Sequence, residues 1–251
     1  MKAPVLAALA ALLAIAACAK PADKTAGAAE PADDPAFHQK VVAYLADHPG
    51  AIQEGITAYN DKQHALLAAK AAVAIGAHHH DLQADARDFV ANPGGRITVV
   101  EFFDYRCPYC KADHAALQAL IQNDKDIRFV FKEYPIIPDK DGQIGVSLRA
   151  AQAALAAKRA GKYLEVHDAL MALPDLDDAA IGQVMRAHGL DPATIQASSD
   201  DLRQITDVRK LAEDIHAIGT PTFIVGDTLV DSSSIPQLAA AIEKARQSAK
   251  S

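Results

Sequence analysis

The sequence alternates short apolar runs with amphipathic stretches after residue 96. Ile97–Phe103 is a nearly continuous β-branched and aromatic run, which predicts a strand buried on both faces. A helix that begins at about Pro108 and ends at about Asn123 is expected next, and Ile127–Tyr134 predicts a second buried strand. Strand, helix and strand with short connections predict a βαβ unit with a parallel strand pair.

Only helical patterns occupy the next stretch, residues 142–218. The helices expected there cover residues 145–160, 163–172, 177–188, 191–197 and 200–217. Thr222–Gly226 then predicts a third strand, which a hairpin turn at Gly226-Asp227 joins to a return strand over Thr228–Val230. A final helix is expected from Ile235 to Ala249. This order predicts an α/β chain with a thioredoxin-like fold over residues 94–250, in which residues 142–218 form an inserted helical subdomain.

Residues 37–92 precede this unit and have a helical pattern that Asp47-His48-Pro49-Gly50 interrupts. A second helix is expected over about 51–79. Its heptad-like apolar stripe consists of Ile52, Ile56, Tyr59, Leu66 and Val73, and Gln63 and Lys70 interrupt that stripe. The stripe either folds back on its own domain or serves self-association. We favour self-association, because the segment lies outside the βαβ unit. We expect His78-His79-His80 to be a solvated helix end and not a metal site, because adjacent imidazoles point in different directions.

Residues 1–18 have the pattern of an export signal, with Lys2 before an apolar run that is too short to span a membrane comfortably. The end of the run, Ile15-Ala16-Ala17-Cys18, resembles the bacterial lipobox, in which the cysteine is lipidated. Ordinary cleavage after Ala19 is the alternative. Residues 19–36 are rich in Pro, Ala and charge, which predicts a flexible tether. We therefore expect a periplasmic or otherwise extracytoplasmic protein, anchored to a membrane if Cys18 carries a lipid.

Composition narrows the classes of function. The 251 residues are half apolar and carry a net charge of −7 with no basic cluster, so nucleic-acid binding is not expected. Apart from Cys18, the cysteines are Cys107 and Cys110. A structural zinc site usually needs four ligands, and a disulfide between these two would close too short a loop to add much stability. The pair therefore predicts a redox-active dithiol without a metal or cofactor.

The dithiol is expected at the start of the helix that follows the first strand. There Cys107 meets unpaired backbone N–H groups and the positive end of the helix dipole, which predict a lowered thiol pKa and a nucleophilic thiolate. Cys110 lies one turn further along and is expected to resolve the mixed disulfide that Cys107 forms. Pro108 and Tyr109 lie between them and are expected to tune the redox potential.

Two other features are expected to serve this dithiol. Glu101 is a charge in an apolar strand. It either helps to move the proton of Cys110 or pairs with a lysine such as Lys132 on the adjacent strand, and the two interpretations are compatible. Thr220-Pro221 at the start of the third strand predicts a cis-proline, beside which the backbone of Thr220 pairs with an extended substrate.

These motifs together resemble the DsbA family of thiol–disulfide oxidoreductases over residues 94–250. The segments that carry the resemblance are Glu101-Phe102-Phe103, Cys107-Pro108-Tyr109-Cys110, Phe131-Lys132-Glu133-Tyr134-Pro135 and Gly219-Thr220-Pro221-Thr222-Phe223. The Cys-Pro-Tyr-Cys centre differs from the Cys-Pro-His-Cys of the archetypal oxidase. With its helical extension the chain is similar to the suppressor-of-copper-sensitivity C proteins, members of which oligomerise through the extension and shuffle disulfides.

The resemblance implies an exported enzyme that exchanges disulfides with protein substrates, as an oxidase, a disulfide isomerase or both. Its implied partners are protein thiols and disulfides, a membrane redox partner and further copies of the chain through residues 37–92. The alternative is a non-enzymatic copper-binding or metal-tolerance module, in which the two thiolates hold Cu(I).

Overall fold

The computed structural model describes residues 34–196, 198–231 and 235–249. The expected export signal, Cys18 and most of the expected tether lie outside the described residues. The chain divides into two compact units, and the division falls between Ala58 and Tyr59. Within the described ranges, no helix has both the length and the apolar character needed to cross a membrane.

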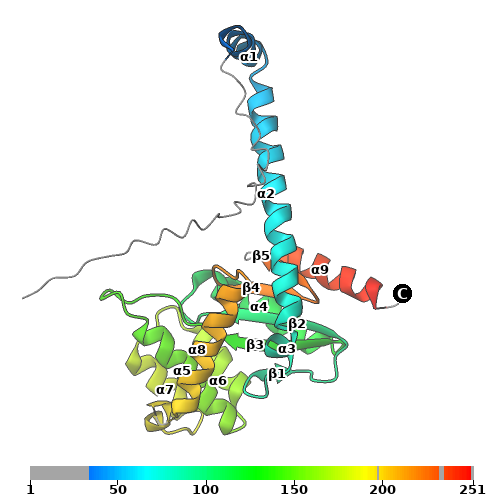
Figure 1. Ribbon diagram of the computed structural model, residues 1–251. Coiled ribbons are helices and arrows are strands. Elements are labelled where there is room, and N and C mark those ends of the chain that lie inside the picture. Colours follow the sequence, from blue (N-terminus) through cyan, green and yellow to red (C-terminus); the bar gives the residue numbers. More distant parts are fainter. Residues whose placement is uncertain (1–33, 197, 232–234, 250–251) are drawn as a thin grey trace, which may run out of the picture. The chain divides into compact units, whose positions relative to one another are not determined.

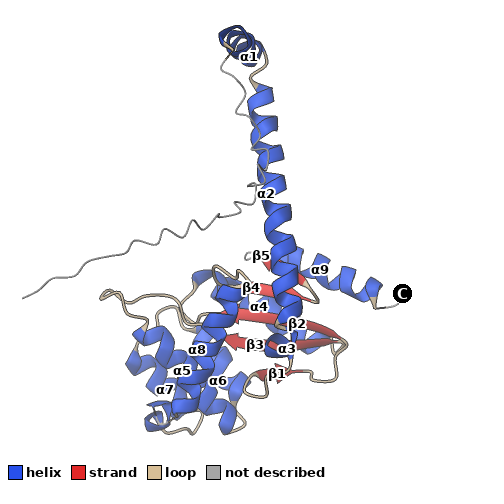
Figure 2. Cartoon of the chain, in the orientation of Figure 1, coloured by secondary structure: helices blue, strands red, loops and turns tan. Residues whose placement is uncertain are grey.

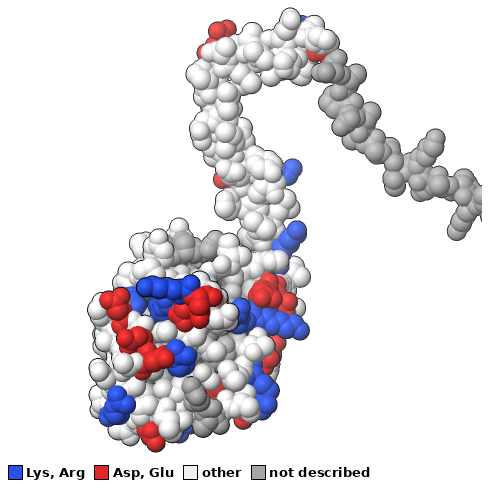
Figure 3. Space-filling model, turned by 90° about the vertical axis from the view of Figure 1, so that its left-hand side faces the viewer, with Lys and Arg blue, Asp and Glu red and all other residues white. Residues whose placement is uncertain are grey.

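The first unit contains helix α1 (Pro35–Asp47) and the beginning of helix α2 (Gly50–Ala77). Asp34 begins α1 as its N-cap, because its side chain accepts a hydrogen bond of 2.9 Å from the Ala36 amide. α1 buries none of its side chains, and Phe37 and Tyr44 are 65% and 56% exposed. The face of this unit drawn in Figure 3 is mostly uncharged. The unit therefore presents apolar side chains to its surroundings.

The second unit holds the end of α2 and all remaining elements (Figure 1). In chain order these are α3 (His79–Gln83), β1 (Phe89–Ala91), β2 (Ile97–Phe103), α4 (Pro108–Asn123), β3 (Ile127–Glu133), α5 (Gly145–Arg159), α6 (Tyr163–Ala172), α7 (Asp178–Ala187), the 3-10 helix η1 (Pro192–Gln196), α8 (Ser199–Asp214), β4 (Thr222–Val225), β5 (Thr228–Asp231) and α9 (Ile235–Ser248).

The strands form one mixed sheet in the order β1-β3-β2-β4-β5 (Figure 2). β2 and β3 are parallel, which confirms the predicted βαβ unit, and every other neighbouring pair is antiparallel. β2 is the central strand, and its Glu101 lies between Phe131 of β3 and Phe223 of β4. The end of β2 therefore meets the beginning of β4.

Each face of the sheet packs against its own helices. One face supplies Phe103, Phe131 and Phe223 to a large core that includes side chains of α4, α5, α6, α7 and α9. The other face packs against α8, α3 and the end of α2, from which Ile75 is fully buried. Burial on both faces explains why the sequences of β2 and β3 are continuous apolar runs.

Two local predictions were wrong. Residues 89–91, expected to be helical, form the edge strand β1, because Phe89, Val90 and Ala91 pair with β3. Residues 191–197 were expected to be an α-helix, but their described part is the 3-10 helix η1. A segment of this length favours the tighter 3-10 turn.

Candidate active site around Cys107 and Cys110

The dithiol lies where β2 gives way to α4. Cys107 is the N-cap of α4 and has extended backbone angles, and Pro108 opens the helix, where a missing N–H costs no hydrogen bond. The Lys111 amide donates to the Cys107 carbonyl at 3.1 Å and closes the first turn. Both cysteines are free thiols, and they are 3% and 1% exposed. The sulfur of Cys107 is therefore held at the helix start with little freedom.

Asp104 holds this loop, although sequence reasoning did not identify it. The Asp104 carboxylate is 1% exposed and accepts a hydrogen bond of 2.8 Å from the Arg106 amide. It also accepts from the amides of Ile136 and Ile137 at 2.8 Å and from the Ser147 hydroxyl at 2.9 Å. One buried carboxylate thus ties the loop before Cys107 to the segment that follows β3.

Thr220 and Pro221 come to the dithiol because β4 runs antiparallel to β2 and begins where β2 ends. The Thr220-Pro221 peptide bond is cis, as predicted. The Cys107 sulfur lies 3.1 Å from the Thr220 carbonyl oxygen. The two motifs, far apart in the sequence, therefore form one site.

The two thiols have opposite pKa shifts. The pKa of Cys107 is lowered to about 6, first by a hydrogen bond from the Cys110 side chain and further by the Thr220 side chain and the backbone amides of α4, against the effect of burial. Burial raises the pKa of Cys110 far above its usual range, and its hydrogen bond to Cys107 and the charge of Glu101 raise it further. At neutral pH Cys107 is thus a thiolate and Cys110 a thiol.

Exposed residues surround these buried sulfurs. Tyr109 is 60% exposed, and Pro108 is also exposed. Ile218, two residues before Thr220, is 85% exposed. A partner that approaches Cys107 therefore encounters apolar side chains from both motifs.

Glu101 is buried in the centre of the sheet and is 2% exposed. Burial raises the pKa of this carboxyl to about 8, and the charges of Asp113 and Cys107 raise it further. The alternative expectation, an ion pair between Glu101 and Lys132, was wrong. Because neighbouring residues of a strand face opposite sides, Lys132 lies across from Phe102 and its ammonium group instead binds the buried carboxylate of Asp88.

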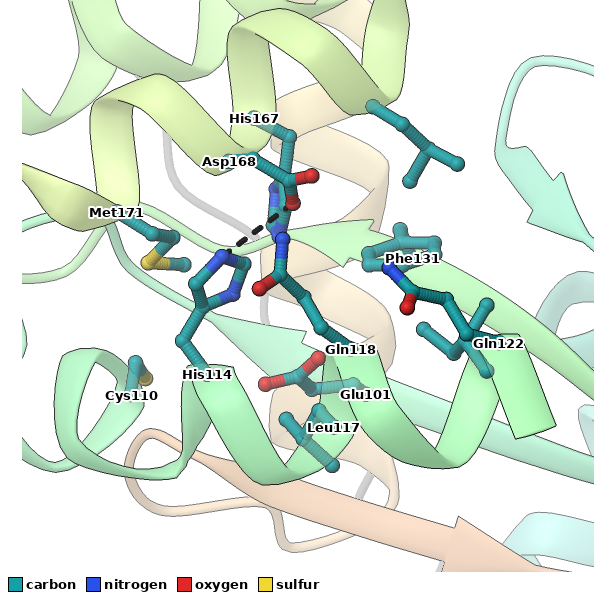
Figure 4. Close-up of a pocket in the computed structure, with 12 residues that line it drawn as sticks. Glu101, Cys110, His114, Leu117, Gln118, Gln122, Phe131, His167, Asp168 and Met171 are labelled. Carbon is teal, nitrogen blue, oxygen red and sulfur yellow. Dashed lines mark ion pairs between the residues drawn. The ribbon is translucent and has the colours of Figure 1, made fainter. Parts of the chain in front are cut away.

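A cavity of about 50 Å³ connects Glu101 and Cys110 with the space between α4 and α6. We refer to it as the α4–α6 cavity. Its polar lining consists of Glu101, Cys110, His114, Gln118, Gln122, His167 and Asp168. Figure 4 shows the two histidines and Asp168 on one side of this cavity, and Glu101 across from them. The volume is enough for a few water molecules, since one needs about 10–15 Å³.

A buried polar network behind the cavity was also not foreseen. Tyr105 and Tyr163 donate hydrogen bonds to Glu133 Oε1 at 3.2 and 2.7 Å, and Tyr105 lies 3.0 Å from His167 Nδ1. Burial lowers the pKa of His167 to about 3, and the neighbouring His114 lowers it further, so this imidazole is neutral. These residues come from the loop after β2, from β3 and from α6, and no local pattern connects them.

Comparisons with known proteins agree with this geometry. Residues 98–243 match the family described as DSBA-like thioredoxin domain. The thiol:disulfide interchange protein DsbA of Bordetella parapertussis is 28% identical over 150 residues, which are 55% of this chain and 67% of that protein. The chain spans about a quarter of the length of the first curated relatives it matches. One of them, the sodium/proton antiporter NhaA 3 of Salinispora tropica, is 31% identical over 65% of this chain and 26% of its own length.

Solved structures give the same result. A thioredoxin-like oxidoreductase from Silicibacter pomeroyi is 36% identical, with a TM-score of 0.62 over 67% of this chain and 97% of that one. ScsC of Proteus mirabilis in a transitional conformation is 25% identical, with a TM-score of 0.62 over 84% of this chain and 98% of that one. These matches confirm the thioredoxin-like α/β fold. The chain therefore belongs to the family of DSBA-like thioredoxin domains, close to the ScsC-type proteins.

Proposed function

We propose that this chain is an exported enzyme that exchanges disulfides with protein substrates through Cys107 and Cys110. The observation that carries the proposal is the opposite state of the two buried sulfurs, because the pKa of Cys107 is about 6 while that of Cys110 is far above the usual range. A thiolate attacks disulfides and leaves from them more readily than a thiol. Cys107 is therefore suited to attack a disulfide as a thiolate, whereas Cys110 stays protonated until it resolves the mixed disulfide.

In the oxidising direction, a substrate thiolate attacks Cys107 of the oxidised pair and breaks its bond to Cys110. Cys110 leaves with the electron pair of that bond, and a mixed disulfide joins the substrate to Cys107. A second substrate thiolate then attacks the substrate sulfur, releases Cys107 as a thiolate and leaves a substrate disulfide. In sum, two substrate thiols are oxidised and the Cys107–Cys110 disulfide is reduced.

Glu101 is proposed to carry the proton of Cys110 in this exchange. Both residues line the α4–α6 cavity, so a water molecule there can bridge them. The protonated carboxyl gives its proton to Cys110 when that sulfur leaves, and the carboxylate removes it when Cys110 attacks. With a pKa of about 8, Glu101 exchanges protons near neutral pH. Pro108 and Tyr109 are proposed to tune the redox potential from their places between the cysteines.

The backbone of Thr220 is proposed to hold an extended substrate. β4 begins at Thr222, so the peptide groups that precede it lie beyond the hydrogen-bonded ladder of the sheet. A substrate segment that pairs with Thr220 would bring its own sulfur to Cys107, which lies 3.1 Å from the Thr220 carbonyl. The exposed side chains of Tyr109 and Ile218 favour apolar residues beside the substrate cysteine.

Substitution of each cysteine tests the assignment. We expect Cys107→Ala to abolish the reduction of insulin disulfides. We expect Cys110→Ala to accumulate mixed disulfides with substrate, because the resolving sulfur is missing. Mixed disulfides are detected as adducts on a non-reducing gel that disappear with dithiothreitol. Full activity in Cys107→Ala would refute the assignment.

Residues 37–92 are proposed to assemble copies of the chain, which would favour disulfide isomerisation. All five stripe residues are at least 49% exposed, so the rest of the described chain does not cover them. Several dithiols on one assembly can hold a misfolded substrate and reshuffle its disulfides, whereas a monomer donates its disulfide and leaves.

Sedimentation of the purified protein tests this assembly. We expect a molecular mass greater than that of one chain, and we expect the double variant Ile52→Ser, Ile56→Ser to reduce it. Lys62→Ser in the same helix is the matched control and should leave the mass unchanged. A single-chain mass for the unmodified protein would contradict assembly and would favour the oxidase.

Export, a lipid on Cys18 and a membrane redox partner complete the proposal. Each rests on residues 1–18 or on the resemblance to ScsC-type proteins. Mass spectrometry of the protein from a bacterial host tests the first two, because a diacylglycerol on Cys18 adds a defined mass to the first residue. A mature chain that begins at Lys20 would show ordinary cleavage and would exclude the lipid.

A further inference from the structure

We propose that His114, His167 and Asp168 form a binding site for a divalent transition metal ion such as Zn²⁺ in the α4–α6 cavity. The proposal is independent of disulfide exchange, because none of these residues belongs to the dithiol. Figure 4 shows the three side chains pointing toward one another from α4 and α6.

The spacing of the donor atoms suits a small metal ion. One donor atom from each of the three residues lies within 4.8 Å of the others. His114 Nε2 and Asp168 Oδ1 are 3.3 Å apart. In a tetrahedral zinc site with bonds of about 2.0–2.1 Å, neighbouring ligand atoms lie about 3.3–3.4 Å apart. One pair therefore already has the required separation, and the donor atom of His167 lies within 4.8 Å of both.

The nitrogen of His114 needs a partner. His114 Nε2 is buried without a hydrogen-bond partner among the described residues, and its polar contact is the ion pair with Asp168 Oδ1 at 3.3 Å. Buried nitrogens of this kind are uncommon because they lose hydration without compensation. A metal ion between His114 and Asp168 would satisfy both residues.

His167 is held by a hydrogen bond at Nδ1, as metal-binding histidines usually are. Tyr105 donates its hydroxyl proton to Glu133, so its oxygen accepts a hydrogen bond from His167 Nδ1 at 3.0 Å. With the proton on Nδ1, the lone pair of His167 is on Nε2. A hydrogen bond on one ring nitrogen that leaves the other for the metal is the usual arrangement.

The charge of the cavity also favours a cation. Asp168 lines it with a carboxylate, whereas no lysine or arginine is among its described lining residues. Asp168 is 38% exposed at its side chain, which gives an ion a route from solvent. Two imidazoles and one carboxylate suit Zn²⁺ and its neighbours better than Mg²⁺ or Ca²⁺, which prefer oxygen. Three protein ligands leave a fourth position for water.

Zn²⁺ titration of the oxidised protein tests the proposal, because the Cys107–Cys110 disulfide removes both thiolates as ligands. We expect one Zn²⁺ per chain in competition with a chromophoric chelator. We expect His114→Gln and Asp168→Asn each to weaken binding at least about tenfold, since even outer-shell substitutions cost about 10–100-fold. The double variant His79→Gln, His80→Gln is the matched control, because it removes exposed histidines elsewhere, and should bind as the unmodified protein does.

Co²⁺ in place of Zn²⁺ identifies the ligands spectroscopically. We expect d–d bands of a nitrogen and oxygen site and no sulfur-to-metal charge-transfer band. The proposal would be overturned by the absence of stoichiometric binding, by unchanged affinity in His114→Gln, or by loss of binding in the control. Insulin reduction is not part of this test, so failure of the metal site and failure of the proposed enzyme are distinguishable.

Discussion

Glu101→Gln tests whether Glu101 accepts the proton that Cys110 must lose before it attacks. The substitution keeps the size of the side chain and removes its ability to accept that proton. With a pKa of about 8, Glu101 is ionised in about one tenth of the molecules at pH 7 and in about nine tenths at pH 9. We therefore expect attack by Cys110 to become up to about tenfold faster over this range in the unmodified protein.

The expected loss of rate in Glu101→Gln follows from the ionised fraction of Glu101. A positioned general base contributes about 10²–10⁴-fold to a rate. Glu101→Gln should lose about this factor at pH 9, and about one tenth of it at pH 7, where most of the carboxyls are already protonated. The charge of Cys107 is one cause of the raised pKa and is absent from the mixed disulfide, so the midpoint of the profile should fall at or below pH 8.

Stopped-flow mixing of the reduced protein with an aromatic disulfide measures this step. Attack by Cys107 releases one coloured thiol in a phase that depends on concentration, and attack by Cys110 releases a second in a phase that does not. With a pKa of about 6, Cys107 is nearly all thiolate above pH 7, so the first phase is an internal control that should change little.

Asp113→Asn is the matched variant for this experiment. The charge of Asp113 is the second cause of the raised pKa of Glu101, after burial. Its removal should move the midpoint of the second phase to lower pH and leave the rate at pH 9 nearly unchanged. The reasoning would be refuted if the second phase of Glu101→Gln had the rate and pH profile of the unmodified protein.

Three further results are expected. The rate of alkylation of Cys107 should rise with pH as its thiolate forms, with a midpoint near pH 6. Cys110→Ala should raise that midpoint, because the hydrogen bond from Cys110 is the main cause of the lowered pKa of Cys107; equal midpoints would contradict this. Glu101→Gln should stabilise the fold against urea above pH 4.5. The folded pKa of Glu101, about 8, is above the ordinary 4.5, so the unmodified protein loses stability as pH rises between these values, by about 3 kcal/mol at pH 7; urea unfolding at pH 4 and pH 7 checks the sign. Lys132→Met should destabilise the fold by about 3–5 kcal/mol, because it leaves the buried carboxylate of Asp88 without its cation, and adding Asp88→Asn should recover most of the loss in the same assay.

In helix α2, the spacing of apolar residues predicted some features correctly and left others undetermined. Its stripe of apolar positions predicted a helix and a surface that needs a partner, and the structure has the helix with those side chains exposed. The same helix buries Ala71 and Ile75 on a different face, against the sheet. Because the alanine-rich sequence has apolar residues on several faces, periodicity could not show which face the core would cover.

Local sequence determined the elements and the dithiol. Ile97–Phe103 is β-branched and aromatic, so it forms a strand, and Pro108 opens a helix, so Cys107 is its N-cap. The cis bond before Pro221 was also recognisable, because a Thr-Pro step at the start of a strand beside a βαβ dithiol is specific. The strand and the helix start depend on interactions between residues that are close in the chain.

Tertiary structure alone decided the partners of the buried polar groups. Lys132 binds Asp88 and not Glu101, because strand register turned its side chain to the other face of the sheet. His114 and Asp168 come together only because α4 and α6 pack side by side, and no spacing in the sequence encodes that contact. The pKa values of Glu101 and Cys110 likewise depend on burial by distant elements. A sequence therefore identifies reactive residues through local geometry, whereas their charge states are set by whatever folding places around them.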